Sequence, residues 1–246
     1  MGQYHFGSGS LYGITTDTMP TPVQFGTLQE VTIDFSSTIK ELFGQNKFSD
    51  VAAQGQMKVT GKAKFGKINA YAYNKLFFNQ TLTTNSMYLV SQNESGTVPS
   101  ASEYTVTVAN STTFDRDLGV IYSATGLPLT RVTTLTAAGQ YTCANGVYTF
   151  YSGDAGASVY ISYIYTSSSS GNTITLKNAA TGTATNWTGI FNGKFNSKQV
   201  TMILNACVSN KLSLISTKVE DFTVPELDFV ATCDSAGILG YLSTVE

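Results

Sequence analysis

The hydrophobic positions near the start of the chain repeat with the two-residue period of a β-strand. Between residues 27 and 40 the apolar side chains share one face: Val31, Ile33, Phe35 and Ile39. Polar side chains share the other face: Thr32, Asp34, Ser36 and Thr38. The pattern therefore predicts a strand with one packed face and one solvated face.

A loop and a second strand are predicted next. Gly44 and Asn46 interrupt the alternation over residues 41–50, and a lysine-rich strand pattern follows over 51–65. The predicted loop keeps three large apolar side chains: Leu42, Phe43 and Phe48. Because exposed apolar groups of this size often mark interaction sites, these three are candidate contact residues.

A change of spacing after residue 65 predicts the one helix of the chain. Apolar residues recur at steps of three and four: Phe65, Ile68, Ala72 and Leu76. This is the period of a helix with one buried face. The helix is expected to begin after Gly66 and to end near Phe78.

Residues 82–180 have a different sequence pattern, with many short apolar runs bounded by Gly, Asn, Pro or Ser. This spacing is typical of an inserted β-sandwich, and the dipeptide Asn145-Gly146 predicts a tight hairpin. The run over 159–165 is apolar on both faces and is therefore predicted to be a central strand. The predicted strands are 87–91, 104–108, 119–122, 130–134, 140–143, 147–150, 158–166 and 173–176.

Strand patterns return after the insertion, at 199–208, 212–218 and 222–232, with a turn expected at Asn210-Lys211. The chain is thus predicted to be mainly β. A split domain of residues 1–81 and 181–246 carries one helix, and an Ig-like β-sandwich at 82–180 interrupts it. Three or four long strands in a small sheet would leave exposed edges, and an uncovered edge invites a neighbouring copy.

Composition excludes several classes of partner. Only 12% of the 246 residues are charged, 35 Thr and 25 Ser supply many hydroxyls, and the net charge is -2. Such a chain lacks the positive field needed by nucleic-acid or anionic-membrane binders. Residues 1–13 show no secretion signal, and no apolar run approaches the roughly 20 residues of a membrane span. We therefore expect a protein that works where it is made, without a membrane partner.

No motif predicts catalysis, a metal or a cofactor. His5, the only histidine, lies in a Gly/Ser-rich arm over residues 2–13, so a histidine-based catalytic site is not expected. Asp115 and Asp117 suggest a calcium loop, but Arg116 between them opposes a cation. Cys143, Cys207 and Cys233 are widely spaced, which favours buried free thiols over a disulfide or zinc framework.

A glycosidase would need two converging carboxylates. The acidic residues that could supply them are Glu220, Asp221, Glu226 and Asp228. Nothing in the sequence indicates that any two converge, and the chain has a single tryptophan, Trp187, where sugar sites usually stack several aromatic rings. We therefore expect that the protein is not an enzyme.

Two clusters of opposite charge flank the insertion. Residues 58–75 hold five lysines and no acid, and residues 219–246 hold six acids and no base. The clusters could pair within one subunit on neighbouring strands, or between subunits, where they would fix the register of an assembly. The candidates for contacts between subunits are Lys58, Lys62, Lys64, Glu220 and Asp221.

Two stretches resemble the tail tube protein, or major tail protein, of long-tailed bacteriophages. The first is VTIDFSSTIKELFGQNKF over 31–48, followed by KVTGKAKF over 58–65. The second is KLSLISTKVEDFTVPELDFVATCDSAG over 211–237. Segments 117–122 and 139–156 are similar to segments of phage virion proteins. Together these stretches cover about three-fifths of the chain, and none of them is a catalytic signature.

The resemblance implies a split tail-tube β-sandwich or barrel domain that assembles as rings of six subunits. Stacked rings would form a hollow tube with a continuous inner β-barrel, a conduit for DNA ejection. The implied partners are further copies of the chain, the tape measure, tail terminator and distal tail or baseplate proteins, and DNA that passes without specific binding. The implied location is the phage virion, after assembly in the host cytoplasm.

The resemblance also implies roles for individual residues. Leu42, Phe43 and Phe48 would lie on the loop that reaches the adjacent ring, the arm 2–13 could clamp a neighbour, and the helix would pack on the outer side, away from the lumen. A lumen should hold few free cations, because each Lys or Arg contact to phosphate adds affinity for DNA. The candidate lumen-facing residues are Thr32, Asp34, Ser36, Thr38, Glu226 and Asp228.

Other classes of function remain open. Residues 82–180 alone would suit a β-sandwich surface-binding, decoration or fibre module of a virion. A hydrolase with an unfamiliar carboxylate pair is a third class. A tube protein forms long particles, a binding module stays small and an enzyme turns over a substrate, so these classes differ in simple observables.

Overall fold

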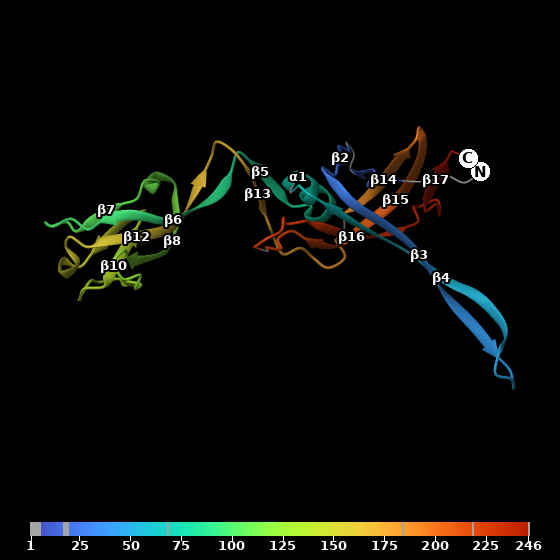
Figure 1. The fold of residues 1–246 in the computed structure, drawn as a ribbon, viewed down its shortest axis with the longest axis horizontal. Helices are drawn as coiled ribbons and strands as arrows, with labels where there is room; N and C mark the ends of the chain where they lie inside the picture. Colours follow the sequence, from blue (N-terminus) through green and yellow to red (C-terminus); the bar gives the residue numbers. More distant parts are fainter. Residues whose placement is uncertain (1–5, 17–19, 68, 184, 218, 246) are drawn as a thin grey trace. The chain divides into compact units, whose positions relative to one another are not determined.

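The computed structural model describes residues 6–16, 20–67, 69–183, 185–217 and 219–245. The chain forms two compact units and is mainly β (Figure 1). Unit 1 comprises residues 1–82 and 174–246, and unit 2 comprises residues 83–173. The insertion predicted over 82–180 thus extends past the end of unit 2.

The described residues of unit 1 form an eight-stranded antiparallel sheet in the order β2-β1-β14-β15-β16-β4-β3, with β17 also paired to β15. Its strands are β1 (Ser10–Thr15), β2 (Pro22–Gln24), β3 (Leu28–Phe43), β4 (Ser49–Phe65), β14 (Asn186–Phe195), β15 (Lys198–Ser213), β16 (Glu226–Thr232) and β17 (Gly240–Thr244). The first part and the last part of the chain therefore build one sheet.

One face of this sheet packs against the helical segment. Helix α1 (Ala70–Tyr73) continues as a π-helical turn, η1 (Asn74–Phe78), and both contribute to the core through Tyr73 and Leu76. Asn69 caps the start, because its side chain accepts hydrogen bonds from two backbone amides of the first turn. The predicted end near Phe78 is confirmed. The predicted start is wrong, since α1 begins at Ala70, and Ile68 lies outside the described residues.

Aromatic rings fill the centre of the core. Trp187 is fully buried, with ring centroids 5.1 Å from Phe229 and 6.4 Å from Phe25. Its indole N–H donates to the Ser209 hydroxyl at 3.0 Å, so its polar atom is satisfied. Unit 1 therefore has one aromatic core between the sheet and the helical segment.

The remaining part of the sheet corrects several predictions. The arm expected over 2–13 is wrong from Ser10 onward, because β1 pairs with β14 and its Leu11 is buried; residues 1–5, including His5, lie outside the described residues. The turn expected at Asn210-Lys211 is also wrong. Strand β15 continues through these residues, and a bulge after Ser209 accommodates the change of pattern.

The described residues of unit 2 form two small sheets, β7-β11-β10-β9 and β6-β12-β8. Their strands are β6 (Met87–Thr97), β7 (Thr105–Thr107), β8 (Phe114–Tyr122), β9 (Thr130–Arg131), β10 (Gln140–Ala144), β11 (Val147–Phe150) and β12 (Ser158–Ser167), and short 3-10 turns are η2 (Ser111–Thr113) and η3 (Ser152–Asp154). A further pair, β5 (Thr81–Thr84) and β13 (Asn172–Thr175), lies where the chain passes between the units. Each strand predicted over 82–180 overlaps a strand of the structure.

Two specific predictions for unit 2 are confirmed. Strand β12 is the central strand of its sheet, between β6 and β8. Asn145 and Gly146 form the β10–β11 turn with positive φ angles of 49° and 77°, the conformation that an Asn-Gly hairpin turn requires.

Candidate functional site

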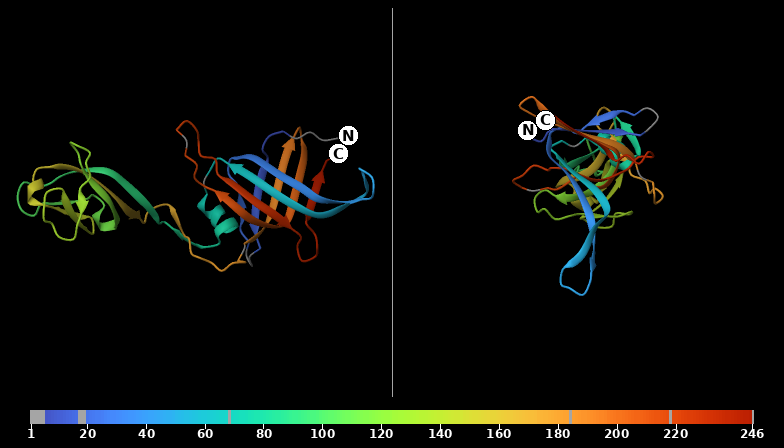
Figure 2. Two further views of the ribbon diagram at one scale, coloured as in Figure 1. Left: turned by 90° about the horizontal axis from the view of Figure 1, so that it is seen from below. Right: turned by 90° about the vertical axis from the view of Figure 1, so that its right-hand side faces the viewer.

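The β3–β4 hairpin is much longer than the sheet to which it belongs. Strand β16 pairs with β4 only from Val59 to Lys64, whereas β3 and β4 remain paired out to Phe43 and Ser49. We call residues 34–58 the distal hairpin, and residues 28–33 with 59–65 the proximal hairpin. Figures 1 and 2 show the distal hairpin leaving the body of unit 1 as a two-stranded ribbon.

A register shift explains the direction of the distal hairpin. Ser37 pairs with Met57, but Ile39 pairs with Gln54, so β4 has one residue more than β3 at this point. Such a bulge bends a strand pair and increases its twist. The strands therefore turn away from the core at the place where β16 no longer accompanies them.

The distal hairpin carries seven large apolar side chains that are between 50 and 85% exposed. They are Phe35, Ile39, Leu42, Phe43, Phe48, Val51 and Met57. Full burial of one such side chain stabilises a protein by about 1.5–3 kcal/mol. A surface that covers all seven could thus gain on the order of 10 kcal/mol.

The backbone of the distal hairpin is open as well. Among the described residues, no strand pairs with the outer edge of β3, and none pairs with β4 between Ser49 and Lys58 apart from β3. An isolated two-stranded hairpin is marginally stable in water, and an unpaired edge is a template for another chain. The distal hairpin therefore has the properties of an interface that a partner completes.

The structure places the three predicted contact residues at the tip of this hairpin. The loop predicted over 41–50 is wrong in its limits, because β3 continues to Phe43 and β4 begins at Ser49. Only residues 44–48 form the turn. Phe48, in that turn, is 85% exposed, and Leu42 and Phe43 are exposed at the end of β3.

A second feature lies on the face of the sheet opposite the core. Along β4 the buried residues alternate with outward ones, and the outward Lys62 is level with Thr32 on β3 and Asp228 on β16. We call this the charged face. It comprises Glu30, Asp34, Lys62, Lys64, Lys211, Glu226 and Asp228.

Ion pairs connect the charged face within one chain. The Lys62 ammonium lies 3.0 Å from a Glu226 carboxylate oxygen, and the Lys211 ammonium lies 3.1 Å from the same oxygen. The Lys64 ammonium lies 2.6 Å from a carboxylate oxygen of Glu30. Hydrogen bonding to Lys62 lowers the pKa of Glu226, and the same bond raises the pKa of Lys62.

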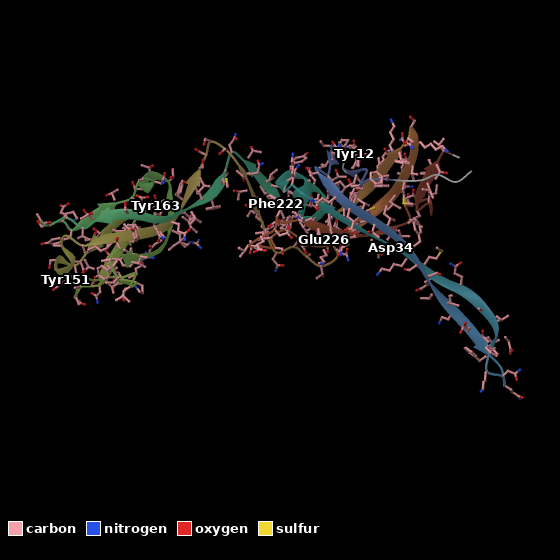
Figure 3. All side chains as sticks on the ribbon, viewed as in Figure 1. Tyr12, Asp34, Tyr151, Tyr163, Phe222 and Glu226 are labelled. Atoms are coloured by element: carbon pink, nitrogen blue, oxygen red, sulfur yellow. The ribbon has the colours of Figure 1, made fainter. Side chains whose placement is uncertain are left out.

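The predicted lumen residues lie on the outward face of the sheet or on the distal hairpin, and Asp34 belongs to both. Thr32, Asp34, Glu226 and Asp228 share the outward face of the sheet, and Figure 3 labels Asp34 and Glu226 there. Ser36 and Thr38 lie on the distal hairpin, where both faces are exposed. Asp34 and Asp228 also line a polar hollow of about 250 Å³ together with Thr60, Lys62 and Asn210.

The candidate charges for contacts between subunits also lie in different places. Lys62 and Lys64 have partners in their own chain, Glu226 and Glu30. Lys58 lies on the distal hairpin, without an ion-pair partner among the described residues. Glu220 and Asp221 lie on the segment between β15 and β16, residues 214–225.

Sequence reasoning missed the exposed character of that segment. Residues 212–218 and 222–232 are predicted as strands, but β15 ends at Ser213 and β16 begins at Glu226. Ile215, Val219 and Phe222 are almost fully exposed. Their spacing of four and three residues is not the two-residue period of a strand, so it was a signal against the two predicted strands.

Tyrosine hydroxyls donate hydrogen bonds to several carboxylates of unit 2. Asp117 accepts hydrogen bonds from the hydroxyls of Tyr141 at 2.7 Å and Tyr148 at 2.9 Å, which suits a structural role better than a calcium loop. Tyr163 is buried and donates to Glu94 (Figure 3). Burial raises the pKa of both Tyr141 and Tyr148, so these phenols stay protonated at neutral pH.

Three further observations bear on chemistry. Within the described ranges, no group of three or more His, Cys, Asp or Glu side chains is arranged to hold a metal ion. The described helices include none with the length and hydropathy of a membrane-spanning segment. The cysteines are free, as predicted, but only Cys207 is buried; Cys143 is half-buried and Cys233 is exposed.

Neither a protein-family model nor a curated protein matches this chain.

Proposed function

We propose that this chain is a structural virion protein, the tail tube protein of a long-tailed bacteriophage. In this proposal, rings of six subunits stack into a hollow tube that conducts DNA into the host. Unit 1 is the tube domain, with a sandwich or barrel formed on assembly, and unit 2 is an Ig-like domain on the outside. Its partners are other copies and the tape measure, tail terminator and distal tail or baseplate proteins.

The distal hairpin is the single observation that carries this proposal. Its seven exposed apolar side chains and its unpaired strand edges favour burial against another protein surface. A repeating assembly of identical copies buries this hairpin in every subunit. The stretch 31–48, which resembles tail tube proteins, overlaps the first half of this hairpin. An element of this kind in a protein that worked alone would be a liability for aggregation.

The charged face supports the conduit part of the proposal. Phosphate contacts to free lysines would bind DNA and slow its passage. Lys62, Lys64 and Lys211 instead form ion pairs within the same chain, with Glu226, Glu30 and Asp228. A lumen lined by this face would combine hydroxyls and paired charges, and would offer DNA little net attraction.

Negative-stain electron microscopy over a range of protein concentrations, with light scattering on the same samples, tests the proposal. We expect hollow tubes or stacked rings of uniform diameter. A matched control replaces residues 38–56 by Asn-Gly, because Ser37 and Met57 are directly paired and a two-residue turn can join them. The shortened chain should fold and remain small. Solid filaments, or a wild-type monomer at every concentration, would contradict the tube.

One observation favours a second candidate, a surface-binding or decoration module. The outward face of the β6-β12-β8 sheet presents exposed Tyr88, Val90 and Leu118. Exposed apolar side chains on one sheet face suit adhesion to a cell surface or capsid. Binding of the full chain to bacterial envelopes that is lost on Val90→Ser, but kept after the hairpin is shortened, would favour this function over the tube.

A further inference from the structure

The segment between β15 and β16 is longer than its connection requires. Ser213 and Glu226 are directly paired, and antiparallel strands can be joined by two to five residues. The chain instead uses residues 214–225, which we call the β15–β16 loop. Long loops in compact domains are usually functional or disordered.

The β15–β16 loop is anchored at its base. Leu214 packs against the core of unit 1, and Pro225 is buried, with its carbonyl accepting from the Phe65 amide at 3.1 Å. Within the loop, the Thr223 hydroxyl donates to the carbonyl of Ser216 at 2.9 Å. These contacts hold the base of the loop in a defined place on the sheet.

The apolar side chains of the loop nevertheless face solvent. Phe222 is 92% exposed, and Ile215 and Val219 are exposed to a similar degree. A held loop that keeps three large apolar groups in water has the composition of a contact surface. The loop shares this property with the tip of the distal hairpin.

The two surfaces lie at opposite ends of unit 1. The loop begins where Ser213, Glu226, Lys64 and Glu30 form one row across four strands. From Glu30, β3 runs 13 residues in the other direction to Phe43, about 40 Å at the usual rise of a strand. Figure 3 shows Phe222 at the end of unit 1 away from the distal hairpin.

We propose that the hairpin tip of one copy docks on the β15–β16 loop of the next copy. This inference rests on the proposed function, because it names the acceptor for the hairpin in a stack of identical subunits. Two different complementary surfaces at opposite ends form a heterologous contact, which leaves a free tip and a free loop after every addition. Such a contact propagates without closing, as an elongating tube requires.

The tip and the loop both expose large apolar rings, and the charged residues beside those rings have opposite signs. Phe48 at the tip is next to Lys47, and Phe222 in the loop is near Glu220. Each surface thus places a large ring beside a charge of sign opposite to that on the other surface.

Cysteine crosslinking of the full chain tests the proposal. The parent carries Cys233→Ser, because Cys233 is the exposed native thiol. Phe48→Cys and Phe222→Cys are added singly and together, and a short bis-maleimide is applied during assembly. We expect a ladder of covalent multimers from the double variant, dimers only from a mixture of the two single variants, and no multimers from either single variant alone.

A matched control and a second variant keep the result interpretable. Leu176 is an exposed apolar residue outside both surfaces, so Phe48→Cys with Leu176→Cys should give no ladder. Phe222→Ser should raise the protein concentration needed for assembly by roughly 10-fold or more, whereas Leu176→Ser should not change it. Because both side chains are exposed, the fluorescence of the buried Trp187 should stay unchanged in both variants.

The outcomes separate this inference from the proposed function. Hollow tubes without a ladder, or dimers from Phe48→Cys alone, would overturn the docking of tip on loop and leave the tube intact. A ladder from solid, non-hollow filaments would support the docking and overturn the tube. A chain that neither associates nor crosslinks at any concentration would overturn both.

Discussion

The proximal and distal parts of the β3–β4 hairpin have the same sequence pattern, but only the proximal part packs against the core of unit 1. Both alternate apolar and polar residues on the same two strands. In the proximal part, Val31 and Ile33 pack against the core, whereas in the distal part Phe35 is 50% exposed and Ile39 is more exposed. The alternating pattern thus predicts an apolar face that packs against something. Only the structure shows whether the packing partner is part of the same chain.

The largest difference should appear in amide hydrogen exchange of the monomer. Proximal amides of β4 are paired on both sides and backed by the core, so we expect protection on the order of 10³-fold or more. Distal amides belong to a marginal two-stranded ribbon and should be protected by roughly 10-fold or less. Mass spectrometry of exchanged peptides measures both, and distal protection should rise on assembly. Equal protection in the monomer would contradict the comparison.

A matched pair of phenylalanine substitutions should show the next largest effect. Phe65→Ala removes a buried ring that lies 5.2 Å from Phe25 and 5.6 Å from Tyr73, and should lower the free energy of unfolding by about 3–5 kcal/mol. Phe43→Ala in the distal part should change it by about 0.5 kcal/mol or less.

Denaturant unfolding followed by tryptophan fluorescence measures this pair selectively. Trp187 is the single tryptophan of the chain and lies in the unit 1 core, so its signal reports unit 1. The protein concentration needed for assembly should rise more in Phe43→Ala than in Phe65→Ala, because Phe43→Ala removes part of the hairpin tip. A large loss of monomer stability in Phe43→Ala would mean that the tip is already packed within its own subunit.

The sequence predicted the strongly patterned elements because their local signals and tertiary packing agree. Residues 51–65 alternate cleanly and become β4, and Asn145-Gly146 becomes the predicted turn because both residues tolerate positive φ. The predicted contact residues Phe43 and Phe48 are exposed at the tip, as large apolar groups near a Gly-Asn interruption suggested.

The missed elements depend on partners that are distant in sequence. Strand β1 includes Gly13 and looks like a flexible arm, yet Gly13 lies against Leu76, where a Cβ would come within 2.8 Å of a methyl group. The turn predicted at Asn210-Lys211 is a bulge, which a two-residue period cannot represent. Lys62 and Glu226 pair although they are 164 positions apart in the sequence. The charge pattern alone therefore could not tell whether the two clusters pair within one chain or between subunits.

Glycine substitutions should separate the two parts of the hairpin by a smaller margin. A Cβ at Gly61, in the proximal part, would overlap the ring of buried Phe229 directly opposite on β16. Gly61→Ala should therefore cost about 1–3 kcal/mol through overpacking. A Cβ at Gly55, in the distal part, would approach the exposed Thr38 hydroxyl at 2.5 Å and the Thr38 carbonyl oxygen at 3.2 Å, and the exposed two-stranded ribbon can shift to make room for it.

Gly55→Ala should accordingly change monomer stability by less than about 1 kcal/mol, measured by the same fluorescence-detected unfolding. The two variants add the same methyl group to the same strand, so each is the control for the other. A cost at Gly55 equal to that at Gly61 would show that the distal ribbon is as tightly constrained as the core.

The smallest effect should come from the charges. Glu226→Gln removes the partner of Lys62 and Lys211 and should cost unit 1 about 0.5–1 kcal/mol, since pairs at a solvated face contribute little. Lys58→Gln, on the distal part of the same β4 strand, has no ion pair to lose among the described residues and is the matched control.

The pH dependence of the Glu226→Gln effect identifies its source. Glu226 has a pKa below its ordinary 4.5 in the folded chain, so its carboxylate stabilises above that value and loses its effect as the pH falls through the lowered pKa. Lys62 has a pKa raised above 10.5, so its contribution is complete below that value and is lost as the pH rises through the raised pKa. The stability gap between wild type and Glu226→Gln should therefore be constant between about pH 5 and 10 and should close below pH 4.5, as the pH falls through the lowered pKa. A gap that persists after the carboxyl is protonated would show that the ion pairs of Glu226 are not its source, because Gln has nearly the same size and shape as protonated Glu.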